Sequence, residues 1–402
     1  MPSPASGVSC SVAPSLLLSA LNSLLPPAAA LSSPPPLRGV ESAQQEMHEL
    51  RLPAPVGRLV LRVWRASSRF ASLGVTRRSP DPACRALHRL ARGPAAVAKI
   101  EVAGYRLARA AVPGLEIPEV LLFREGEGGG PAFALFRFVE APGPEPRMVK
   151  ARLEFGAEEE HLRHGRLPSA AVLPYCSDLI ASFLLPLAHR CWSEPPSPQI
   201  PRTTTPDLLA AYAAASSLLS SRLLPSSPPP LHAAVPSLPP LLSRLSSLLP
   251  GLPPLPPTLV HLDLQPQNLL FGPAGIVGVL DFEEAAVADP RLEVALVCRR
   301  VCADLEQAGA VWREFSSVVV DSYAWGDGDN GGDRTGGMAF WLLLEHAHVC
   351  VTLMLQLLAK DLSGARGTEL MVNEKDGGLL EKLEREVGRR AKLEELLTSE
   401  TK

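Results

Sequence analysis

Two carboxylates and one amide stand at fixed spacing around a short apolar hairpin in the C-terminal half of the chain. Asp263 and Asn268 lie five positions apart, and Pro266 between them prevents a regular helix, so both belong to a loop. Asp281 ends an apolar stretch thirteen residues after Asn268, and a turn at Gly272–Gly275 would fold that stretch back beside the loop. We therefore expect the three side chains to meet at one place.

This set of side chains suits the transfer of a phosphoryl group to a hydroxyl. Asp263 would accept the proton of the attacking hydroxyl, while Asn268 and Asp281 would hold Mg²⁺ on the nucleotide phosphates. Magnesium takes few protein oxygens and keeps several waters, so one amide and one carboxylate suffice. His261 would fix the loop by hydrogen bonding. A lone His-x-Asp is common, but the complete set in this order is far rarer.

The elements that must position these residues can be read from the surrounding sequence. Asn268–Phe271 and Ile276–Leu280 are the two strands of the predicted hairpin. Apolar residues at helical spacing predict two helices further on, over Arg291–Asp304 and Phe340–Leu362, and the chain from Leu379 is expected to be a charged amphipathic surface helix. The C-terminal part, residues 258–402, is thus predicted to be mainly helical.

The N-terminal part, residues 39–142, is predicted to be a small α+β unit. Met47–Leu52 and Arg58–Trp64 alternate polar and apolar residues around a turn containing Pro and Gly, which is typical of a β-hairpin. Two further strands are expected at Ile117–Phe123 and Ala132–Glu140, after a stretch of helical composition. The unit should contain a sheet of at least four strands with one or two helices.

Between these units, residues 143–257 are predicted to begin the larger unit and to carry a proline-rich insertion. Asp178–Arg190 and Asp207–Leu224 are each compatible with a helix. The sequence contains 42 prolines, many of them in this region. We expect Pro228–Pro230 to be extended and residues 225–257 to be a protease-sensitive linker.

The first 38 residues contain no Asp or Glu and only one basic residue, Arg38. Ser, Ala, Pro and Leu dominate, which favours a disordered leader. A plastid or mitochondrial transit peptide is the alternative, because such peptides are acid-poor and Ser-rich, although they usually contain more Arg. The cytoplasm is the expected location.

Composition excludes several classes of protein. Lys and Arg total 39 against 42 Asp and Glu, a net charge of −3, which argues against a basic nucleic-acid surface. No run of apolar residues reaches the length of a membrane span, so no membrane partner is expected. The seven cysteines form no Cys-x-x-Cys pair and are expected to be buried thiols, with Cys298 and Cys302 as the alternative of a metal or redox pair. The oligomeric state stays open.

Three motifs resemble those of the aminoglycoside phosphotransferase and choline-kinase-like family. The segment His261-Leu-Asp-Leu-Gln-Pro-Gln-Asn-Leu-Leu270 is similar to its catalytic loop, and Val279-Leu-Asp-Phe-Glu283 to its metal-binding motif. Asp289-Pro-Arg-Leu-Glu-Val-Ala295 is similar to a downstream Asp-Pro-x-x-Asp-Leu-Ala element, with Glu293 where Asp is usual. The resemblance is strong over residues 258–297.

The resemblance implies an α+β, protein-kinase-like fold of two lobes, with a small β-rich N-lobe and a larger, mainly helical C-lobe. It extends more weakly over residues 39–142. There Arg62 occupies the place of the basic residue that contacts nucleotide phosphates, and Glu101 fits the acidic partner that anchors it; a surface ion pair is the alternative. Phe133–Glu140 resembles the hinge strand whose backbone binds adenine.

These features predict a kinase that uses ATP and Mg²⁺ to phosphorylate a hydroxyl of a small molecule. The alternative is a catalytically weak or inactive binding protein of the same fold, because the family's Gly-rich phosphate cover is reduced to the single glycine of Gly39-Val-Glu-Ser-Ala43. Glu283, Glu284 and Glu345 could form an anionic pocket for an amine-bearing acceptor. A metal-dependent hydrolase using Glu345-His-Ala-His348 is a third candidate.

Overall fold

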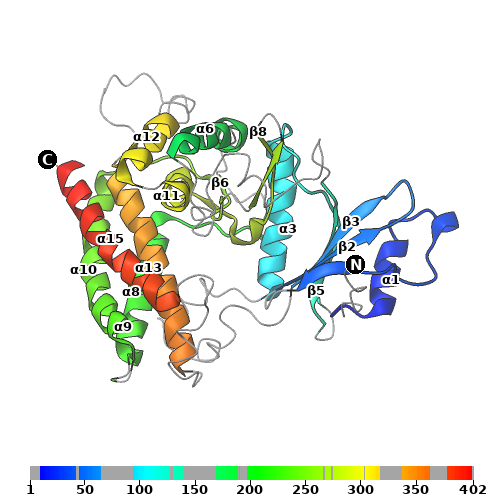
Figure 1. Ribbon diagram of the computed structural model, residues 1–402, viewed down its shortest axis with the longest axis horizontal. Coiled ribbons are helices and arrows are strands. Elements are labelled where there is room, and N and C mark those ends of the chain that lie inside the picture. Colours follow the sequence, from blue (N-terminus) through cyan, green and yellow to red (C-terminus); the bar gives the residue numbers. More distant parts are fainter. Residues whose placement is uncertain are drawn as a thin grey trace.

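The computed structural model describes residues 10–41, 45–64, 94–126, 130–139, 169–188, 190, 197–223, 225, 227–265, 268–272, 275–302, 304–316, 337–362 and 378–400. They form two lobes (Figure 1). A β-sheet with helix α1 (Pro14–Asn22) lies at one end of the molecule and a bundle of helices at the other, with helix α3 (Pro94–Ala111) between them. The predicted α+β organisation in two lobes is confirmed.

The N-lobe is built on a five-stranded antiparallel sheet with the strand order β1-β2-β3-β5-β4. Its strands are β1 (Arg38–Glu41), β2 (Gln45–Arg51), β3 (Arg58–Trp64), β4 (Val120–Arg124) and β5 (Ala132–Arg137). The predicted hairpin and both further strands are present. Strand β1 was not predicted, because its four residues carry no alternating apolar pattern.

Both faces of this sheet are buried. Side chains alternate between the two faces along each strand. On one face Trp64, Ala134 and Phe136 belong to the large core shared with α3. On the other face a second core forms around α1, and it contains Leu50, Leu59, Leu61, Val63, Phe133 and Leu135 of the sheet.

The predicted disorder of residues 1–38 is wrong for residues 10–38, because α1 packs on the sheet. Leu17 and Leu21 are buried in the second core, and the Asn22 side chain bonds the backbone N–H and C=O of Leu31. The Leu residues of this stretch supply an apolar stripe at helical spacing, which its overall Ser, Ala and Pro content conceals. Loss of this segment would uncover an apolar face of the sheet.

The C-lobe is mainly helical, with two short two-stranded sheets near its centre. Its helices are α6 (Ser169–Leu179), which continues through the π-helical turn Ile180–Leu184 into α7 (Leu185–Ala188), α8 (Thr205–Arg222), α9 (Pro229–Ala234), α10 (Leu238–Leu248), α11 (Pro290–Val301), α12 (Leu305–Phe315), α13 (Met338–Leu362) and α15 (Leu379–Glu400). Its strands are β6 (Thr258–Val260), β7 (Leu269–Gly272), β8 (Gly275–Val279) and β9 (Ala286–Ala288). Single 3₁₀ turns lie at Pro27–Ala29, Val235–Ser237, Leu249–Gly251 and Phe282–Glu284 (η6).

Residues 229–251 of the proline-rich stretch are helical, which corrects the prediction of an extended linker there, while residues 253–257 form no helix. Pro229 begins α9, and α10 likewise has proline in its first turn. Proline is well tolerated there, because the first helical N–H groups have no intrahelical acceptor and the fixed φ suits a helix. Both helices bury leucines, and they pack against α15 and α13.

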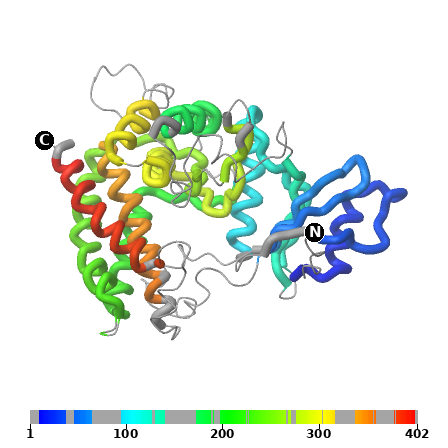
Figure 2. The backbone as a smooth tube through the Cα atoms, in the orientation of Figure 1, coloured from blue at the N-terminus to red at the C-terminus, as the bar shows by residue number. Residues whose placement is uncertain are grey.

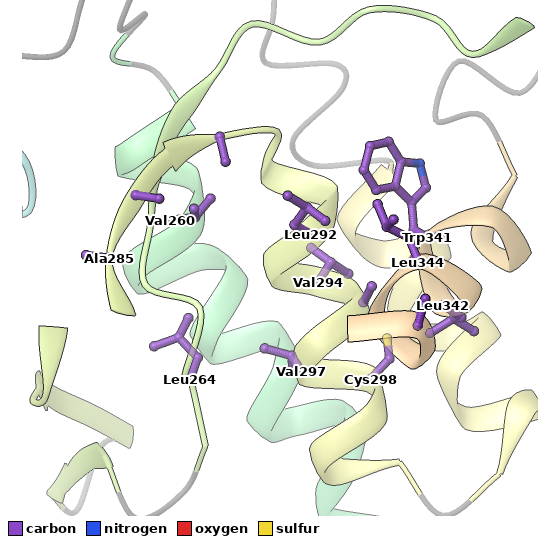
Figure 3. Close-up of a cluster of buried hydrophobic side chains, with 14 of the residues drawn as sticks. Val260, Leu264, Ala285, Leu292, Val294, Val297, Cys298, Trp341, Leu342 and Leu344 are labelled. Atoms are coloured by element: carbon purple, nitrogen blue, oxygen red, sulfur yellow. The ribbon is translucent and has the colours of Figure 1, made fainter. Parts of the chain in front are cut away.

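Helix α13 is the centre of the C-lobe core. Figure 3 shows Trp341, Leu342 and Leu344 of α13 beside Val294 and Cys298 of α11. The stretch Met338–Leu355 is long and apolar enough to cross a membrane, but 83% of it is buried inside the protein, as in a core helix. Cys298 and Cys302 are buried free thiols.

Helix α15 lies on the side of the C-lobe away from the sheet (Figures 1 and 2). It packs along α13 through Leu383, Leu393 and Leu397, so the predicted amphipathic helix is present and its apolar stripe is covered.

Candidate active site

The backbone of the loop after β6 is held by one buried carboxylate, that of Glu293 on α11. Its Oε2 accepts the backbone N–H of Leu262 at 2.8 Å and also that of His261. Burial raises the pKa of Glu293 to about 7, while these backbone N–H donors act to lower it. Leu262 adopts a positive φ of 61°, an uncommon conformation for leucine that this clamp sustains. Sequence reasoning noted Glu293 only as a departure from the motif and missed its role.

His261 is fully buried and lies between two backbone segments. Its Nε2 is 2.7 Å from the carbonyl oxygen of Leu280, and its Nδ1 accepts the N–H of Asp263 at 3.2 Å. Burial lowers the pKa of His261, which favours the neutral imidazole with the proton on Nε2. His261 therefore orients the loop, as its sequence position predicts, and does not reach a reacting atom.

Asp263 is held by two neutral amides and remains partly open. Gln265 Nε2 donates to both carboxylate oxygens at 2.9 and 3.0 Å, and Asn268 Nδ2 donates to Oδ2 at 2.9 Å. Arg300 Nη2 is 3.6 Å from Oδ1. The side chain keeps 19% of its surface accessible, so a ligand can reach it. Gln265 and Arg300 were not singled out from the sequence.

Asn268 and Asp281 lie side by side at the open end of the β7–β8 hairpin. Leu280 N donates to the Asn268 backbone oxygen at 2.8 Å, which places the next residue, Asp281, beside Asn268. Asn268 turns its amide nitrogen toward Asp263, so its amide oxygen is left for another partner. Asp281 has a left-handed backbone, with φ 68° and ψ 59°, and its N–H donates to the Tyr105 hydroxyl at 2.8 Å. The structure thus brings the Asn268 side chain into contact with Asp263 and places Asp281 next to Asn268 along the backbone.

Arg62 of β3 lies among three carboxylates. Nη1 is 2.5 Å from Glu101 Oε1, and Nη2 is 2.7 Å from Asp281 Oδ1 and 3.6 Å from Glu283 Oε2. Trp64 Nε1 donates to the second oxygen of Glu101 at 3.0 Å. The Arg62 side chain is only 6% exposed, so the alternative of a surface ion pair is wrong.

The charge on Arg62 is secured by its partners. Burial acts to lower the pKa of the guanidinium, but the carboxylates of Glu101 and Asp281 outweigh this and raise it. Because Glu101 lies on α3 and Asp281 follows β8, Arg62 joins the sheet, α3 and the hairpin end in one contact.

Two glycines allow close approaches, that of Gly104 on α3 to η6 and that of Gly278 on β8 to the segment before β4. A Cβ on Gly104 would lie 2.7 Å from Phe282 Cβ, and one on Gly278 would lie 2.4 Å from the Glu116 carbonyl oxygen. Next to Gly278, Glu116 N donates to the Val277 oxygen at 2.6 Å. Gly104 lies inside α3, where its lack of a side chain serves packing.

The residues present fit Mg²⁺ at one place, and at a second place the Arg62 guanidinium already supplies the positive charge. The Asn268 amide oxygen and Asp281 Oδ2, the carboxylate oxygen other than the one that contacts Arg62, are the hard oxygen donors that magnesium prefers. Carboxylate oxygens of Glu101, Asp281 and Glu283 also lie within 4.8 Å of one another, but the Arg62 guanidinium contacts all three. A metal at this second place would compete with the guanidinium.

The motif Glu345-His-Ala-His348 does not converge on a metal, which corrects the hydrolase alternative. Glu345 pairs with Arg299 at 2.6 Å, His346 Nδ1 is 3.2 Å from Glu386, and His348 Nδ1 is 2.9 Å from the Tyr212 hydroxyl. The pairing also neutralises Glu345, so this residue does not contribute to an anionic pocket with Glu283 and Glu284.

Comparison with known proteins points to one family. The sequence profile of the phosphotransferase enzyme family (APH) matches residues 49–327. No curated protein sequence matches this chain. A putative aminoglycoside phosphotransferase from Ralstonia eutropha JMP134 is 13% identical in sequence, over 93% of this chain and 98% of its own, with a TM-score of 0.52. This similarity shows a shared fold.

Two further solved structures align less closely. A thermostable mutant of the aminoglycoside phosphotransferase APH(4)-Ia is 19% identical over 83% of this chain and 96% of its own, with a TM-score of 0.47. The macrolide 2′-phosphotransferase MphH from Brachybacterium faecium is 16% identical over 83% of this chain and 89% of its own, with a TM-score of 0.44.

Proposed function

The chain belongs to the phosphotransferase enzyme family, and from this membership we propose that it transfers the γ-phosphoryl group of ATP to a hydroxyl of a small molecule. The observation that carries the proposal is the chain of contacts that links Asp263 to Asn268, Asn268 to the backbone beside Asp281, and Asp281 to Arg62. These are the side chains that a phosphoryl transfer needs, and they come from a loop and a hairpin that other buried groups hold in place.

Asp263 is the proposed general base. Its carboxylate is partly exposed, accepts hydrogen bonds from Gln265 and Asn268, and has a longer ion pair with Arg300 at 3.6 Å. A carboxylate in this setting can accept the proton of an acceptor hydroxyl as the oxygen attacks phosphorus. His261 and Glu293 act as positioning residues, because they fix the backbone on which Asp263 stands.

Arg62 is proposed to contact the nucleotide phosphates. Its planar guanidinium is suited to phosphate oxygens, and Glu101 fixes its direction. Mg²⁺, held by Asn268 and Asp281, would neutralise charge on the phosphate oxygens. The remaining contribution of the protein is to position the acceptor hydroxyl and the phosphoryl group in line.

The acceptor is a small molecule, and its class is the open part of the proposal. Glu283 and Glu284 follow Asp281 directly, and Glu284 is exposed, so a positively charged amino group on the acceptor would be favoured there. Amino alcohols, amino sugars and amino acids with a hydroxyl are therefore the first compounds to screen.

The test measures ADP release from ATP with purified full-length protein against a panel of hydroxyl compounds, with and without Mg²⁺. We expect turnover with at least one amine-bearing compound and none without the metal. Asp281→Ala should weaken Mg²⁺-dependent nucleotide binding by more than the roughly 10–100-fold that loss of an outer-shell partner costs a metal site. Overlapping Mg²⁺ titrations of this variant and the wild type would contradict the metal assignment.

A nucleotide-induced thermal shift separates the inactive alternative from this proposal. Stabilisation by ATP and Mg²⁺ without ADP release across the whole panel would favour a binding protein of the same fold. Absence of both the shift and the turnover would contradict the nucleotide role of Arg62 as well.

A further inference from the structure

Two polar residues of β2 are buried on the apolar face of the sheet that α1 covers. Glu46 and His48 are both 0% exposed, and they alternate with Leu50 along the same face. Their cross-strand neighbours on β3 are Val63 and Leu61, which belong to the second core. Burial of a carboxylate and an imidazole among such neighbours is costly unless their polar atoms are bound.

The known hydrogen bonds leave one of these polar atoms unbound. Glu46 accepts from the backbone N–H of Ser11 at 3.0 Å and from the Ser11 hydroxyl, and its Oε2 is 3.1 Å from His48 Nε2. His48 Nδ1 is buried and has no hydrogen-bond partner in the described part of the chain. A buried imidazole nitrogen without a partner needs an explanation, and a bound ion at the imidazole is one.

A third donor lies beside this pair. The Sγ of Cys10, a carboxylate oxygen of Glu46 and a ring nitrogen of His48 all lie within 4.8 Å of one another. Ligand atoms around a tetrahedral zinc lie about 3.4–3.8 Å apart, given metal–ligand bonds of about 2.0–2.3 Å. Small side-chain rotations would therefore suffice to bring the three atoms to one ion.

We propose that Cys10, Glu46 and His48 bind Zn²⁺. A thiolate, an imidazole and a carboxylate are together the donor set of zinc, whereas magnesium and calcium take oxygen ligands. With three protein ligands, a water molecule would complete the tetrahedron. The ion would bind the imidazole that is now incompletely paired and compensate the buried negative charge of Glu46.

This zinc site is separate from the phosphoryl-transfer site. Arg62 pairs with Met47 in the β2–β3 register, so it lies on the opposite face of the sheet from Glu46 and His48. The ion would fasten the chain immediately before α1 to β2. Its expected effect is to stabilise the packing of residues 10–22 on the N-lobe.

The first experiment measures metal content and affinity in untagged full-length protein. Protein freed of metal by chelation and dialysis should take up one Zn²⁺ per chain when zinc is added. Co²⁺ in place of zinc should give the near-ultraviolet charge-transfer band of a thiolate ligand. Cys10→Ser should abolish this band, and Glu46→Gln and His48→Ala should weaken zinc binding by more than the roughly 10–100-fold cost of an outer-shell change.

Glu49→Gln is the matched control. Glu49 lies on the same strand but on the other face, where it pairs with Arg51 and Arg58. This variant should bind zinc like the wild type. Absence of stoichiometric binding in the wild type, or equal affinity in Cys10→Ser, would overturn the proposal.

A second measurement on the unaltered protein avoids any effect of substitutions on folding. Zinc should slow the alkylation of Cys10 in the native chain, followed by mass spectrometry of the modified peptide, and excess chelator should restore the rate. An alkylation rate of Cys10 that is the same with zinc and with chelator would also overturn the proposal.

Discussion

The carboxylates around Arg62 and the carboxylate of Asp263 differ in what holds them. Around Arg62, the carboxylates of Glu101 and Asp281 contact a buried guanidinium at 2.5 and 2.7 Å. Asp263 is instead held by neutral amides, and the nearest recorded positive group, on Arg300, lies at 3.6 Å. The carboxylates around Arg62 pair with it at short distance, while Asp263 has only a longer ion pair and keeps 19% of its side-chain surface accessible.

The difference separates a structural role from a reactive one. A buried ion pair is costly to break, because loss of one member leaves an uncompensated charge. The carboxylate of Asp263 is partly exposed, so a ligand can reach it. Substitutions of Arg62 or Glu101 should therefore mainly lower stability. Substitutions of Asp263 should lower turnover with little change in stability.

Asp263→Asn should give the largest effect. The amide is of similar size but cannot take the proton of the acceptor, so turnover should fall by about 10²–10⁴-fold while nucleotide binding stays unchanged. Single-turnover kinetics with ATP and nucleotide-binding titrations measure the two quantities. Asp207→Asn, on the first turn of α8, is the control and should keep full turnover. A rate above about a tenth of the wild type in Asp263→Asn would remove this residue from the mechanism.

Arg62→Ala should reduce the free energy of unfolding by about 3–5 kcal/mol, because it leaves buried carboxylates without their counter-charge. The double variant Arg62→Ala and Glu101→Ala should lose little more free energy of unfolding than Arg62→Ala alone, because the two side chains form one ion pair. Chemical denaturation of the two single variants and the double variant measures the coupling. Arg51→Ala is the surface control, with a side chain that is 68% exposed, and it should change stability by about 0–1 kcal/mol. Additive losses in the cycle would show that Arg62 and Glu101 are independent.

Glu293→Gln should change how stability depends on pH. The pKa of Glu293 is about 7 in the folded chain against an ordinary value of 4.5. The folded state therefore binds this proton more tightly, and the resulting stability is complete below pH 4.5 and is lost as the pH rises to about 7. The difference of about 2.5 pH units corresponds to at most about 3 kcal/mol.

The measurement compares denaturation of the wild type and Glu293→Gln at several values between pH 4.5 and pH 8. The variant cannot titrate at this position. The difference in free energy of unfolding between the two proteins should therefore change between pH 4.5 and pH 7 and level off above pH 7. A constant difference at every pH would contradict the raised pKa of Glu293.

Gly104→Ala should have the smallest effect of the four, a loss of about 1–3 kcal/mol, because its Cβ would meet Phe282 at 2.7 Å. Gly388→Ala on α15 is the matched control, since nothing lies within 4 Å of the added methyl group. Replacing glycine by alanine in an open helix should stabilise by about 0.5–1 kcal/mol. If thermal unfolding shows that both variants change the stability in the same direction, the tight packing of α3 on η6 is contradicted.

The elements nearest the motifs were predictable from the sequence. The hairpin of β7 and β8 and the strands β2 to β5 carry their own signals, namely alternation and turn residues, and these are local. The clamp by Glu293 on the backbone of His261 joins residues 32 positions apart, and the Arg62 contact with Asp281 joins residues 219 positions apart. Such contacts depend on how whole elements pack, so the roles of Glu293, Tyr105 and Gly104 were not predictable from local patterns.

Composition misled the prediction in two places for one physical reason. In residues 10–38 and 225–257 the abundance of Ser, Ala and Pro suggested disorder, but spaced leucines decide the outcome because they bury on folding. Proline at a helix start is compatible with the helix that follows. The positions of residues therefore carried more information than their totals.

The backbone contact between Glu116 and Val277 affects how the lobes can move. It links the segment before β4 directly to β8, and Gly278 beside it has no room for a side chain. A rotation of the N-lobe about this point would leave the link intact and would separate Arg62 from Asp281, which stand on opposite sides of the boundary. Release of spent nucleotide would then proceed by hinge bending, at a rate governed by the free energy needed to part that ion pair.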